Sequence, residues 1–401
     1  MGYRTVGEVR VWGEPLGNAV EQAEMCALTA ERVALMADHH LGYSQPIGGV
    51  VAYRDKVSPS GVGYDIACGN KAVKLDADPC DIQDRIAEAM DAIWSDLSFG
   101  VGRTNAEPVG DPLFDDAAWD IEAAGKLKGL AQSQLGTIGS GNHYVDVFLD
   151  ESETDVWVGV HFGSRGLGHK LATHFIKAGG GKDGINASPT LLDADSQLGQ
   201  EYIACMDLAG RYAYAGRDWV CGRVADILGA GIVDEVHNHH NFAWEEVHDG
   251  ERYWVVRKGA TPNFPGQRSF IGGSMGDISV IVEGAGGEES EAALHSTVHG
   301  AGRVMSRTQA AGKRRWRRIG KKGSKRQVQV SEGRISPQMM EDWVQREGVE
   351  LRGAGTDESP HCYKRLPDVL EHHRETFKGI QVLRPIGVAM AGAMEHDPYR
   401  D

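Results

Sequence analysis

Five short segments of the chain carry residue types that bind metal ions or attack phosphorus, and most of them are bordered by glycine. The segments are residues 62–69, 141–143, 161–166, 239–241 and 299–303, and their candidate residues are Asp65, Cys68, His143, His161, His240 and His299. Glycine lacks a Cβ and tolerates positive φ, so such loops can turn tightly and point backbone N–H groups at an anion. Together the segments predict a metal-dependent enzyme that acts on phosphate.

The metal prediction depends on the whole set of ligands. Cys68 alone is more often a buried structural residue, because free cysteine is among the most buried residue types. Together, three imidazoles, one carboxylate and one thiolate supply enough ligands for a two-metal site with open positions for substrate, and a thiolate can bridge the metals. Softness favours Zn, Co or Fe for such ligands, so the residues alone leave the identity of the metal open.

His299 is the candidate nucleophile. Small residues follow it, and Arg303 supplies positive charge nearby. A neutral imidazole nitrogen can attack phosphorus and form a phosphoramidate, which divides one displacement into two. The alternative is that His299 is a further metal ligand or an ordinary turn residue. Arg165 and Ser274 are further candidates for phosphate contacts, with ordinary loop-surface residues as the alternative.

The composition is that of an ordinary globular protein. The 401 residues are 41% hydrophobic and 7% aromatic, which is enough for one large core or two smaller ones. The 53 glycines exceed the usual share of roughly 7% and indicate many loops with special backbone angles. No internal repeat or low-complexity linker divides the sequence, so we expect one catalytic unit over residues 1–401.

Membrane proteins and disulfide-rich proteins are both disfavoured. No run approaches the ~20 apolar residues of a membrane span, and the first residues lack the apolar region of a signal peptide. We therefore expect a cytoplasmic protein with no membrane partner. The cysteines lack the paired spacing of a disulfide framework or a zinc ribbon. They are Cys26, Cys68, Cys80, Cys205, Cys221 and Cys362.

A local basic segment is the candidate surface for a nucleic acid. The net charge of −15 makes the chain a poor general attractor of polyanions, so RNA would need a local basic patch. Residues 311–328 contain such a patch, which includes Lys313, Arg314, Arg315 and Trp316. There the charges can grip phosphates and the indole can stack on a base. The alternative is a solvated surface loop with no partner.

Several candidate residues lie at the ends of predicted strands. Residues 144–148 alternate with period two after His143, and residues 156–160 form a short apolar run that ends at His161. Further strands are predicted at residues 46–53, 252–257 and 278–282.

Two helices are predicted from caps and spacing. Asp81 can cap a helix whose apolar residues lie at positions 82, 86, 90 and 93. Ser336 and Pro337 begin a late helix, because serine caps well and proline fits the first helical position. The order of strands and helices does not match a simple parallel doubly wound sheet.

At these motifs the chain resembles the RtcB family of RNA-splicing ligases. The resemblance covers almost the whole chain, with the motifs in family order. Its segments are residues 37–42, 65–69, 135–143, 161–168, 239–241, 257–260, 273–276, 299–307 and 383–388. It implies an α+β fold, in which a single large catalytic domain has mixed and antiparallel sheets flanked by helices and residues 311–328 are a basic insertion. It also implies an RNA ligase that uses Mn²⁺ and GTP to join an RNA 3′-phosphate or 2′,3′-cyclic phosphate end to a 5′-hydroxyl end.

The resemblance implies a role for each candidate residue. One Mn²⁺ would be held by Asp65, Cys68 and His143. The second would be held by Cys68, His161 and His240, so that Cys68 bridges the two ions. His299 would take GMP from GTP and pass it to the RNA 3′-phosphate, and GMP would leave when the 5′-hydroxyl attacks. A cyclic end would first be opened.

The resemblance also implies which residues surround the nucleotide. They are Asn142, His143, Asp146, His240, Asn241, Gly272, Gly273, Ser274, Met275, Ser279, His299, Gly300, Ala301 and Gly302. Three positions near or within this set depart from the family pattern. Met390 stands where the family has a lysine that contacts guanine, Asp146 stands where glutamate is usual, and Gly272 stands where proline is usual. Guanine selectivity is therefore an open question.

Two alternatives to this RNA ligase follow. One is an RtcB-like nucleotidyl-transferring enzyme with altered nucleotide or end specificity, prompted by Met390 and Asp146. The other is a non-ligating RNA-binding repair protein, although such a protein has no chemical need for the whole ligand set. The resemblance also raises an archease-type activator as a partner.

Overall fold

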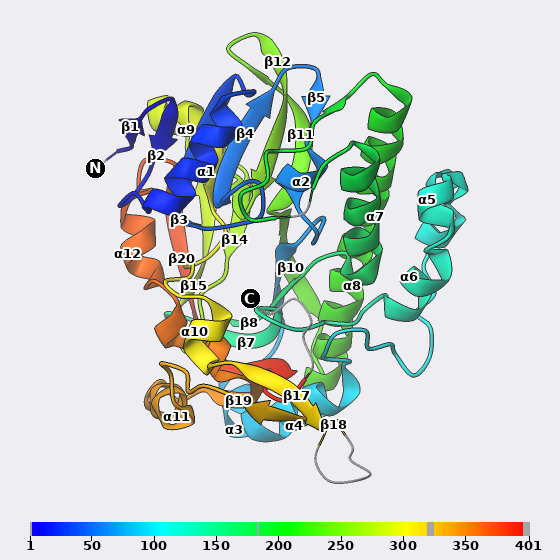
Figure 1. Cartoon of the computed structure of the whole chain (residues 1–401). Helices are drawn as coiled ribbons and strands as arrows, with labels where there is room; N and C mark the ends of the chain where they lie inside the picture. Colours follow the sequence, from blue (N-terminus) through cyan, green and yellow to red (C-terminus); the bar gives the residue numbers. More distant parts are fainter. Residues whose placement is uncertain (1, 183, 319–324, 396–401) are drawn as a thin grey trace.

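Two large sheets and the helices around them make up the structure (Figure 1). It is a computed structural model that describes residues 2–182, 184–318 and 325–395. Among these residues, no helix is both long enough and apolar enough to cross a membrane.

The smaller of the two large sheets contains the N-terminal strands. Its spatial order is β1 (Arg4–Val6), β2 (Val9–Val11), β3 (Arg32–His40), β4 (Ile47–Tyr53), β12 (Glu251–Lys258) and β11 (Asn241–His248). The larger sheet has the order β10 (Ile232–His239), β6 (Gly69–Leu75), β8 (Val156–Phe162), β7 (Tyr144–Asp150), β20 (Phe377–Gly392), β15 (Ser279–Gly284) and β14 (Arg268–Ile271), with β19 (Glu350–Ala354) also paired to β20.

Strand pairing is mixed. Most neighbours are antiparallel, while β2 pairs with β3 and β19 with β20 in parallel. Three short antiparallel pairs complete the strands: β13 (Ala260–Pro262) with β16 (Ser296–Val298), β17 (Arg314–Arg318) with β18 (Lys325–Gln329), and β5 (Lys56–Val57) with β9 (Leu192–Asp193). The predicted α+β class with mixed and antiparallel sheets is confirmed.

Helices surround both sheets. The α-helices are α1 (Gly17–Ala27), α2 (Pro59–Val62), α3 (Pro79–Asp84), α4 (Ile86–Asp96), α5 (Glu122–Gly125), α6 (Lys128–Gln134), α7 (Arg165–Ala178), α8 (Gln197–Leu228), α9 (Glu288–Ala292), α10 (Arg307–Ala311), α11 (Pro337–Arg346) and α12 (Leu366–Glu371). Short 3₁₀ turns lie at η1 (Pro112–Asp115), η2 (Ala117–Asp120), η3 (Thr356–Glu358) and η4 (Pro360–Cys362).

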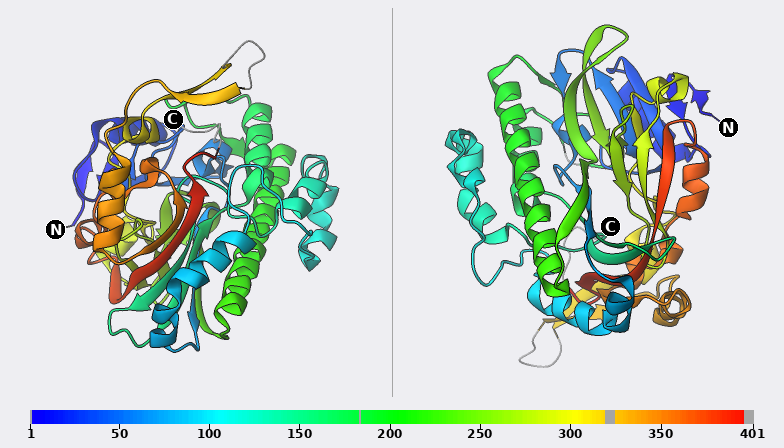
Figure 2. Two further views of the ribbon diagram at one scale, coloured as in Figure 1. Left: turned by 90° about the horizontal axis from the view of Figure 1, so that it is seen from below. Right: turned by 180° about the vertical axis from the view of Figure 1, so that it is seen from behind.

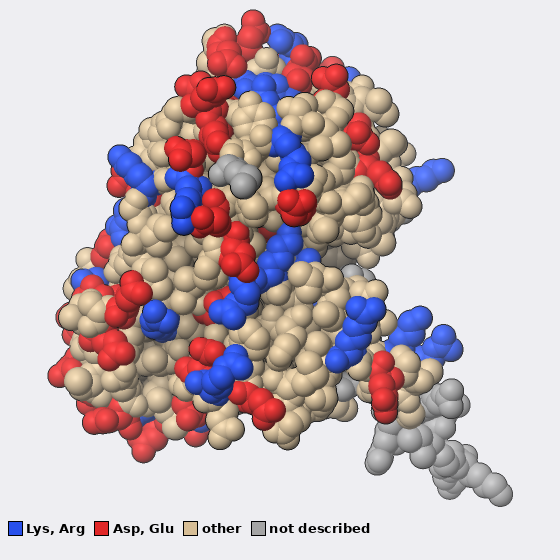
Figure 3. All heavy atoms as spheres, turned by 90° about the vertical axis from the view of Figure 1, so that its left-hand side faces the viewer, with Lys and Arg blue, Asp and Glu red and all other residues tan. Residues whose placement is uncertain are grey.

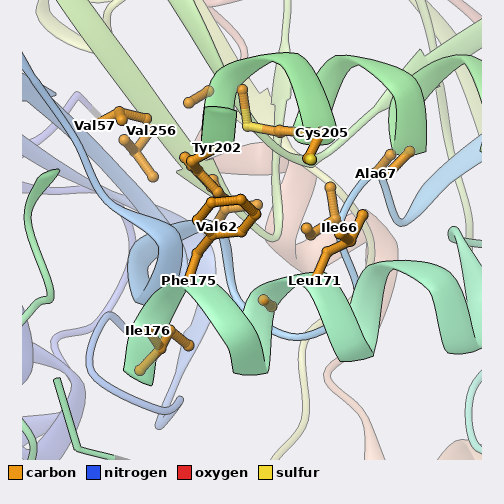
Figure 4. Close-up of a cluster of buried hydrophobic side chains, with 14 of the residues drawn as sticks. Val57, Val62, Ile66, Ala67, Leu171, Phe175, Ile176, Tyr202, Cys205 and Val256 are labelled. Carbon is orange, nitrogen blue, oxygen red and sulfur yellow. The ribbon is translucent and has the colours of Figure 1, made fainter. Parts of the chain in front are cut away.

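The long helix α8 packs against β8, β6 and β10 of the larger sheet, and α7 lies beside it (Figures 1 and 2). Between the two helices, Leu171 and Phe175 of α7 belong to the same buried cluster as Cys205 of α8. Figure 4 shows Ile66 and Ala67 beside this cluster. Both residues are fully buried, so the loop that carries Asp65 and Cys68 is anchored by apolar contacts.

Most of the predicted elements are present. The strands expected at residues 46–53, 144–148, 252–257 and 278–282 correspond to β4, β7, β12 and β15. The late helix is α11, and the Ser336 hydroxyl accepts a hydrogen bond from the Met339 backbone N–H at 3.2 Å. The strand expected at residues 156–160 extends to Phe162, so His161 lies inside β8.

The single helix expected from Asp81 is a wrong prediction. The structure has two helices, α3 and α4, separated at Arg85, where φ is −116°. Asp78, not Asp81, caps the first of them by accepting from the Cys80 backbone N–H. Asp81 instead forms an ion pair with Arg85, one turn later. Apolar spacing continues across the break, which is why the sequence suggested one continuous helix.

Candidate metal centre and nucleotide pocket

The predicted metal ligands meet at one edge of the larger sheet. Cys68 directly precedes β6, His143 directly precedes β7, and His161 is the next-to-last residue of β8. In an antiparallel sheet the start of one strand lies beside the end of its neighbour, so the order β6-β8-β7 gathers these three residues. His240 directly follows β10, the other neighbour of β6. Residues far apart in the chain therefore converge because of strand order.

The ligand atoms lie close enough to share metal ions. The Asp65 Oδ2 atom is 3.0 Å from His143 Nε2, and Cys68 Sγ is 3.6 Å from the same nitrogen. Cys68 Sγ is 3.2 Å from His161 Nε2, which is 3.3 Å from His240 Nε2. The ligand atoms form two groups, Asp65 with Cys68 and His143, and Cys68 with His161 and His240, each within 4.8 Å. Either group could hold a metal ion, and Cys68 belongs to both.

Backbone carbonyls contact the second ring nitrogen of two of the ligand histidines. His143 Nδ1 is 3.0 Å from the Ile138 carbonyl, and His161 Nδ1 is 3.0 Å from the Asn142 carbonyl. A carbonyl can only accept, so His161 Nδ1 carries the proton and His161 Nε2 presents a lone pair to the centre. His143 has further contacts, because its Nε2 faces the Asp65 carboxylate and its Nδ1 also faces the Arg165 guanidinium. The donor set therefore fits a divalent transition metal, the kind of ion predicted from the sequence.

Burial strongly affects the protonation states of the metal-ligand side chains. It lowers the pKa values of His161 and His240 well below the usual range, which keeps both rings in the neutral form that binds metal. Burial would raise the pKa of Asp65, but the hydrogen bond and charge of His143 bring it to about 2. Burial and the neighbouring Asp65 raise the pKa of the Cys68 thiol. A bound cation would instead lower the pKa of Cys68, because metals bind the thiolate.

His299 lies beside this centre and is held by a buried carboxylate. Its ring centroid is 4.8 Å from that of His240. Asp38 Oδ2 lies 2.6 Å from His299 Nδ1 and also accepts from the His299 backbone N–H at 3.0 Å and the Gly300 backbone N–H at 3.3 Å. With the proton held on Nδ1, the nitrogen left for nucleophilic attack is Nε2.

Asp38 is a functional residue to which the sequence analysis gave no role. It is fully buried in β3. Burial would raise its pKa, but the charge of His299 and the hydrogen bonds from it bring the pKa below the usual value. The signal available in the sequence was a carboxylate that directly follows the apolar run of residues 33–37, because a buried charge needs a partner. Nothing local to residues 37–42 shows that this partner is His299.

A pocket opens from the metal ligands and His299 toward the predicted nucleotide residues. The predicted nucleotide residues that line it are Asn142, Asp146, His240, Asn241, Gly272, Gly273, Ser274, Met275, His299, Gly300, Ala301 and Gly302. Ser279 lies behind the lining, where its hydroxyl accepts from the Gly273 backbone N–H at 2.9 Å. His143 faces Asp65. The loops at Gly272 and Gly300 form a parallel bridge across the pocket.

Comparison with known proteins decides the family. The sequence profile described as tRNA-splicing ligase RtcB matches residues 19–391. The chain belongs to the RtcB family. It is 34% identical over 313 aligned positions to the RNA-splicing ligase RtcB of Escherichia coli K12, covering 70% of this chain and 76% of that protein. Identity to the tRNA-splicing ligase RtcB of Archaeoglobus fulgidus is 32% over 461 positions, with coverage of 93% and 91%. For the protein of that name from Thermococcus kodakarensis it is 30% over 437 positions, with coverage of 88% and 86%.

One end of the pocket contains Met390 and Asp146, two of the residues predicted to depart from the family pattern. Met390 pairs with Tyr144 across strands β20 and β7, and Val388 pairs with Asp146. All four residues are buried and line the pocket. Burial raises the pKa of Asp146 well above its usual value, and its Oδ1 atom has no hydrogen-bond partner among the described residues. This end of the pocket therefore places one carboxyl group and the Tyr144 hydroxyl beside the apolar side chains of Val388 and Met390.

The two arginines predicted near phosphate occupy different places in this RtcB chain. Arg303 lines the pocket, but its guanidinium donates to Glu358 Oε2 at 3.0 Å and to the Tyr363 hydroxyl at 2.8 Å. Arg165 begins α7 with φ of +55°, and its Nη1 is 3.2 Å from His143 Nδ1. Arg165 thus lies behind a metal ligand, where its charge helps to lower the pKa of Asp65.

The described part of the basic segment contains two paired strands, and none of its residues is among those that line the pocket. Strands β17 and β18 pair in antiparallel register (Figure 1), and Lys313 and Arg315 are exposed. Arg314 and Trp316 lie in β17, but their side chains are not among those described. Residues 319–324, which complete the predicted patch, lie outside the described residues.

Proposed function

We propose that the chain is an RNA ligase that joins a 3′-phosphate or 2′,3′-cyclic phosphate end of RNA to a 5′-hydroxyl end. GTP and two Mn²⁺ ions are its proposed cofactors. The observation that carries the proposal is the position of His299: it is oriented by Asp38 and adjoins two overlapping metal-ligand groups. Family membership and the names of the relatives support the same activity.

The proposed reaction has three displacements at phosphorus. His299 Nε2 attacks the α-phosphorus of GTP, so that an N–P bond forms and the bond to pyrophosphate breaks. An oxygen of the RNA 3′-phosphate then displaces the histidine and takes the GMP. Finally the RNA 5′-hydroxyl attacks the activated 3′-phosphate, and GMP leaves. A cyclic end must first be hydrolysed to a 3′-phosphate.

The residues of the chain supply the positions that these steps need. Asp38 keeps a proton on His299 Nδ1 and favours the charge that develops on the ring during attack. The proposed metal ligands are Asp65, Cys68 and His143 for one ion and Cys68, His161 and His240 for the other. Bound there, paired cations would neutralise phosphate charge and activate an attacking oxygen.

Glycine lets the backbone of His299–Gly302 approach a nucleotide. Gly302 has φ of +75°, and a Cβ on it would lie 2.1 Å from the Asp38 carbonyl oxygen. A larger residue would push this loop off β3 and away from the pocket. The N–H groups of such loops are suited to triphosphate oxygens.

RNA is proposed to bind through local charge. On the face drawn in Figure 3, lysine and arginine side chains are interspersed with aspartate and glutamate. With a net charge of −15, a general attraction to RNA is not expected. We assign the phosphate contacts to Arg303, which lines the pocket, and to the basic insertion at residues 311–328, within a single catalytic domain that spans the chain. Arg165, the other arginine expected near phosphate, lies behind His143 and would act on phosphate only through its charge. A cytoplasmic location and an archease-type activator belong to the same proposal.

Labelling of His299 tests the chemistry. Purified protein is incubated with Mn²⁺ and α-³²P-GTP or α-³²P-ATP, and the protein-bound label is tested for the acid lability and alkali stability of a phosphoramidate. GTP should label the wild type, and His299→Ala should abolish the label. His174→Ala is the matched control, because His174 is exposed on α7 and should label normally. Absence of label in the wild type with every divalent metal would instead support a non-ligating repair protein.

The end of the pocket that contains Asp146 and Met390 favours a second candidate, an RtcB-family enzyme with altered nucleotide specificity. A neutral carboxyl group at Asp146 has one donor and one acceptor, which match N1 and the amino group of adenine. An ionised carboxylate instead matches the two donors of guanine. The raised pKa of Asp146 and the apolar Met390 beside it favour the neutral form. Labelling by ATP in preference to GTP would support this candidate over the first.

A further inference from the structure

A fully buried arginine lies behind the metal centre and has no role in the reaction described above. Arg217 is on α8 and has 0% of its surface exposed. Its guanidinium donates to the Ala67 carbonyl at 3.1 Å, the Phe162 carbonyl at 2.5 Å and His239 Nδ1 at 2.9 Å. A fourth hydrogen bond, from Nε, goes to His237 Nε2 at 2.7 Å.

Three of these four acceptors belong to residues that adjoin metal ligands. Ala67 precedes Cys68, Phe162 follows His161, and His239 precedes His240. Cys68, His161 and His240 form one complete ligand group, the second of the two described above. One side chain is thus bonded to the neighbour of every ligand in that group.

Strand register explains how one guanidinium can reach all three. Gly69, the first residue of β6, pairs with Phe162 on one side and with His239 on the other. The ends of β8 and β10 therefore flank the start of β6, and Arg217 lies across the three of them. Gly69 has to be glycine here, because a Cβ would lie 2.2 Å from the Asn238 carbonyl oxygen.

The face of α8 is shaped to hold His239 in this position. The rings of Tyr214 and His239 stack with centroids 4.0 Å apart, and the Arg217 guanidinium lies 5.3 Å from the Tyr214 ring centroid. Tyr214 and Arg217 are three residues apart and so share a helix face. One turn earlier, a Cβ on Gly210 would lie 3.4 Å from His239 Nε2.

Arg217 does not form an ion pair within the described part of the chain; its guanidinium binds several uncharged acceptors and fixes the distances between them. Among the described residues, its hydrogen bonds go only to carbonyl oxygens and imidazole nitrogens. The planar guanidinium offers five N–H donors in a fixed geometry. No other common side chain can hold three strand ends at fixed spacing in this way.

We infer that Arg217 is a positioning residue that holds Cys68, His161 and His240 in the geometry of the second metal site. The inference rests on the two-metal site of the proposed function. It goes beyond that function because it assigns a residue that positions the ligands of the second metal ion only. The first group depends less on Arg217, because His143 and Asp65 are held by the Ile138 carbonyl and by each other.

Metal binding to the full-length protein, stripped of metal with a chelator, tests the inference without relying on catalysis. Titration with Mn²⁺ followed by calorimetry should show two equivalents for the wild type. In Arg217→Met, one equivalent should bind as before and the other about 10–100-fold more weakly, the usual cost of losing a group that orients a ligand. Val224→Ala is the control: it removes a buried contact on the same helix, so it should lower Tm and retain both equivalents.

Two variants that each lack one metal ligand show which ion loses affinity when Arg217 is replaced. His143→Ala removes a ligand of the first group only, so its remaining equivalent should weaken when Arg217→Met is added. His161→Ala removes a ligand of the second group only, so adding Arg217→Met there should leave the remaining affinity unchanged. A purely structural role for Arg217 would weaken metal binding equally in both variants.

The conservative variant keeps the test decisive if Arg217→Met does not fold. Arg217→Lys retains the charge but offers a single ammonium, which cannot span the three acceptors. It too should lose affinity at the second site only. Wild-type affinity at both sites in either variant, or equal loss at both sites, would overturn the inference. Fewer than two equivalents in the wild type would instead overturn the two-metal function itself.

Discussion

Two buried charges of the smaller sheet and one buried charge beside the larger sheet have different kinds of partner. In the smaller sheet, Arg257 of β12 contacts Glu246 of β11 at 2.6 Å, and Asp38 of β3 contacts His299 at 2.6 Å, so each is paired with a titratable side chain. At the edge of the larger sheet, Arg217 is surrounded by uncharged acceptors, and Cys68 carries a thiol whose pKa burial raises. The paired groups of the smaller sheet have their electrostatic partners within the protein, whereas the metal ligands at the strand ends of the larger sheet lack theirs until cations bind.

The largest effect that this comparison predicts is at Cys68. Cys68→Ala should lose both metal equivalents and all labelling of His299, because its sulfur is common to both ligand groups. Titration and labelling check this together. Cys221→Ala is the matched control, since Cys221 is a buried free cysteine on α8 and should behave like the wild type. Full labelling of Cys68→Ala would remove the shared thiolate from the proposal.

The Asp38 pair belongs to the smaller sheet but acts on the site, so its removal should separate chemistry from metal binding. In Asp38→Asn we expect the rate of His299 labelling to fall on the order of a hundredfold or more, because a neutral amide supports the charged ring poorly and permits the wrong tautomer. The number of bound metal ions should stay at the wild-type value. Asp150→Asn is the control, because it removes a carboxylate from the last residue of β7, where it accepts from the backbone of the following turn. Loss of metal in Asp38→Asn would contradict the division between the two sheets.

The ion pair of Arg257 with Glu246 should contribute to stability and not to metal binding. Arg257→Met leaves the buried Glu246 with His248 as its remaining partner and should reduce the free energy of unfolding by about 3 kcal/mol, whereas Arg257→Met with Glu246→Leu should recover most of that loss. Urea denaturation measures both changes. Neither variant should alter metal stoichiometry. Arg217 donates to four residues, so no single second substitution should restore the stability lost in an Arg217 variant. Such a recovery would contradict the difference between the two arginines.

A smaller effect is expected in the dependence of stability on pH. Burial would raise the pKa of Glu246, but Arg257 and His248 bring it below the ordinary value of 4.5. The folded carboxyl therefore stabilises the protein above about pH 4.5, and this contribution is lost as the pH falls through the lower, folded-state pKa. Between pH 5 and 3 the wild type should lose on the order of 1 kcal/mol more than the Arg257→Met, Glu246→Leu variant. Parallel acid denaturation curves would show that this carboxyl is not shifted.

The metal ligands could be predicted from the sequence because each combines a reactive side chain with a local signal. Cys68 lies in a glycine loop, and His143 and His161 lie at strand termini. The structure brings these residues together as expected. The separate strands 46–53 and 144–148 were also found, since period-two patterns and apolar runs are local properties.

The supports of the site could not be predicted in the same way, because they are long-range contacts. Asp38 and His299 are 261 residues apart, and Arg217 is 150 residues from Ala67. Helix α8 also escaped prediction, since Gly199, Gly210 and other glycines interrupt its helical signal. Those glycines allow close packing: a Cβ on Gly210 would lie 2.9 Å from the Phe242 ring. An arginine in such a segment reads as a solvent-exposed residue until the fold is known.

The arrangement of the ligands at alternate strand starts and ends has a consequence for how the protein matures. Cys68 and His240 become neighbours only after β6 has paired with β10, and in sequence β7, β8, α7 and α8 lie between these two strands. Such long-range pairing forms slowly and late. A nascent chain that has not yet emerged past β10 therefore lacks the second cation site altogether. Cation uptake by the newly made polypeptide should consequently report that the sheet has closed, and it would then lock that closed arrangement.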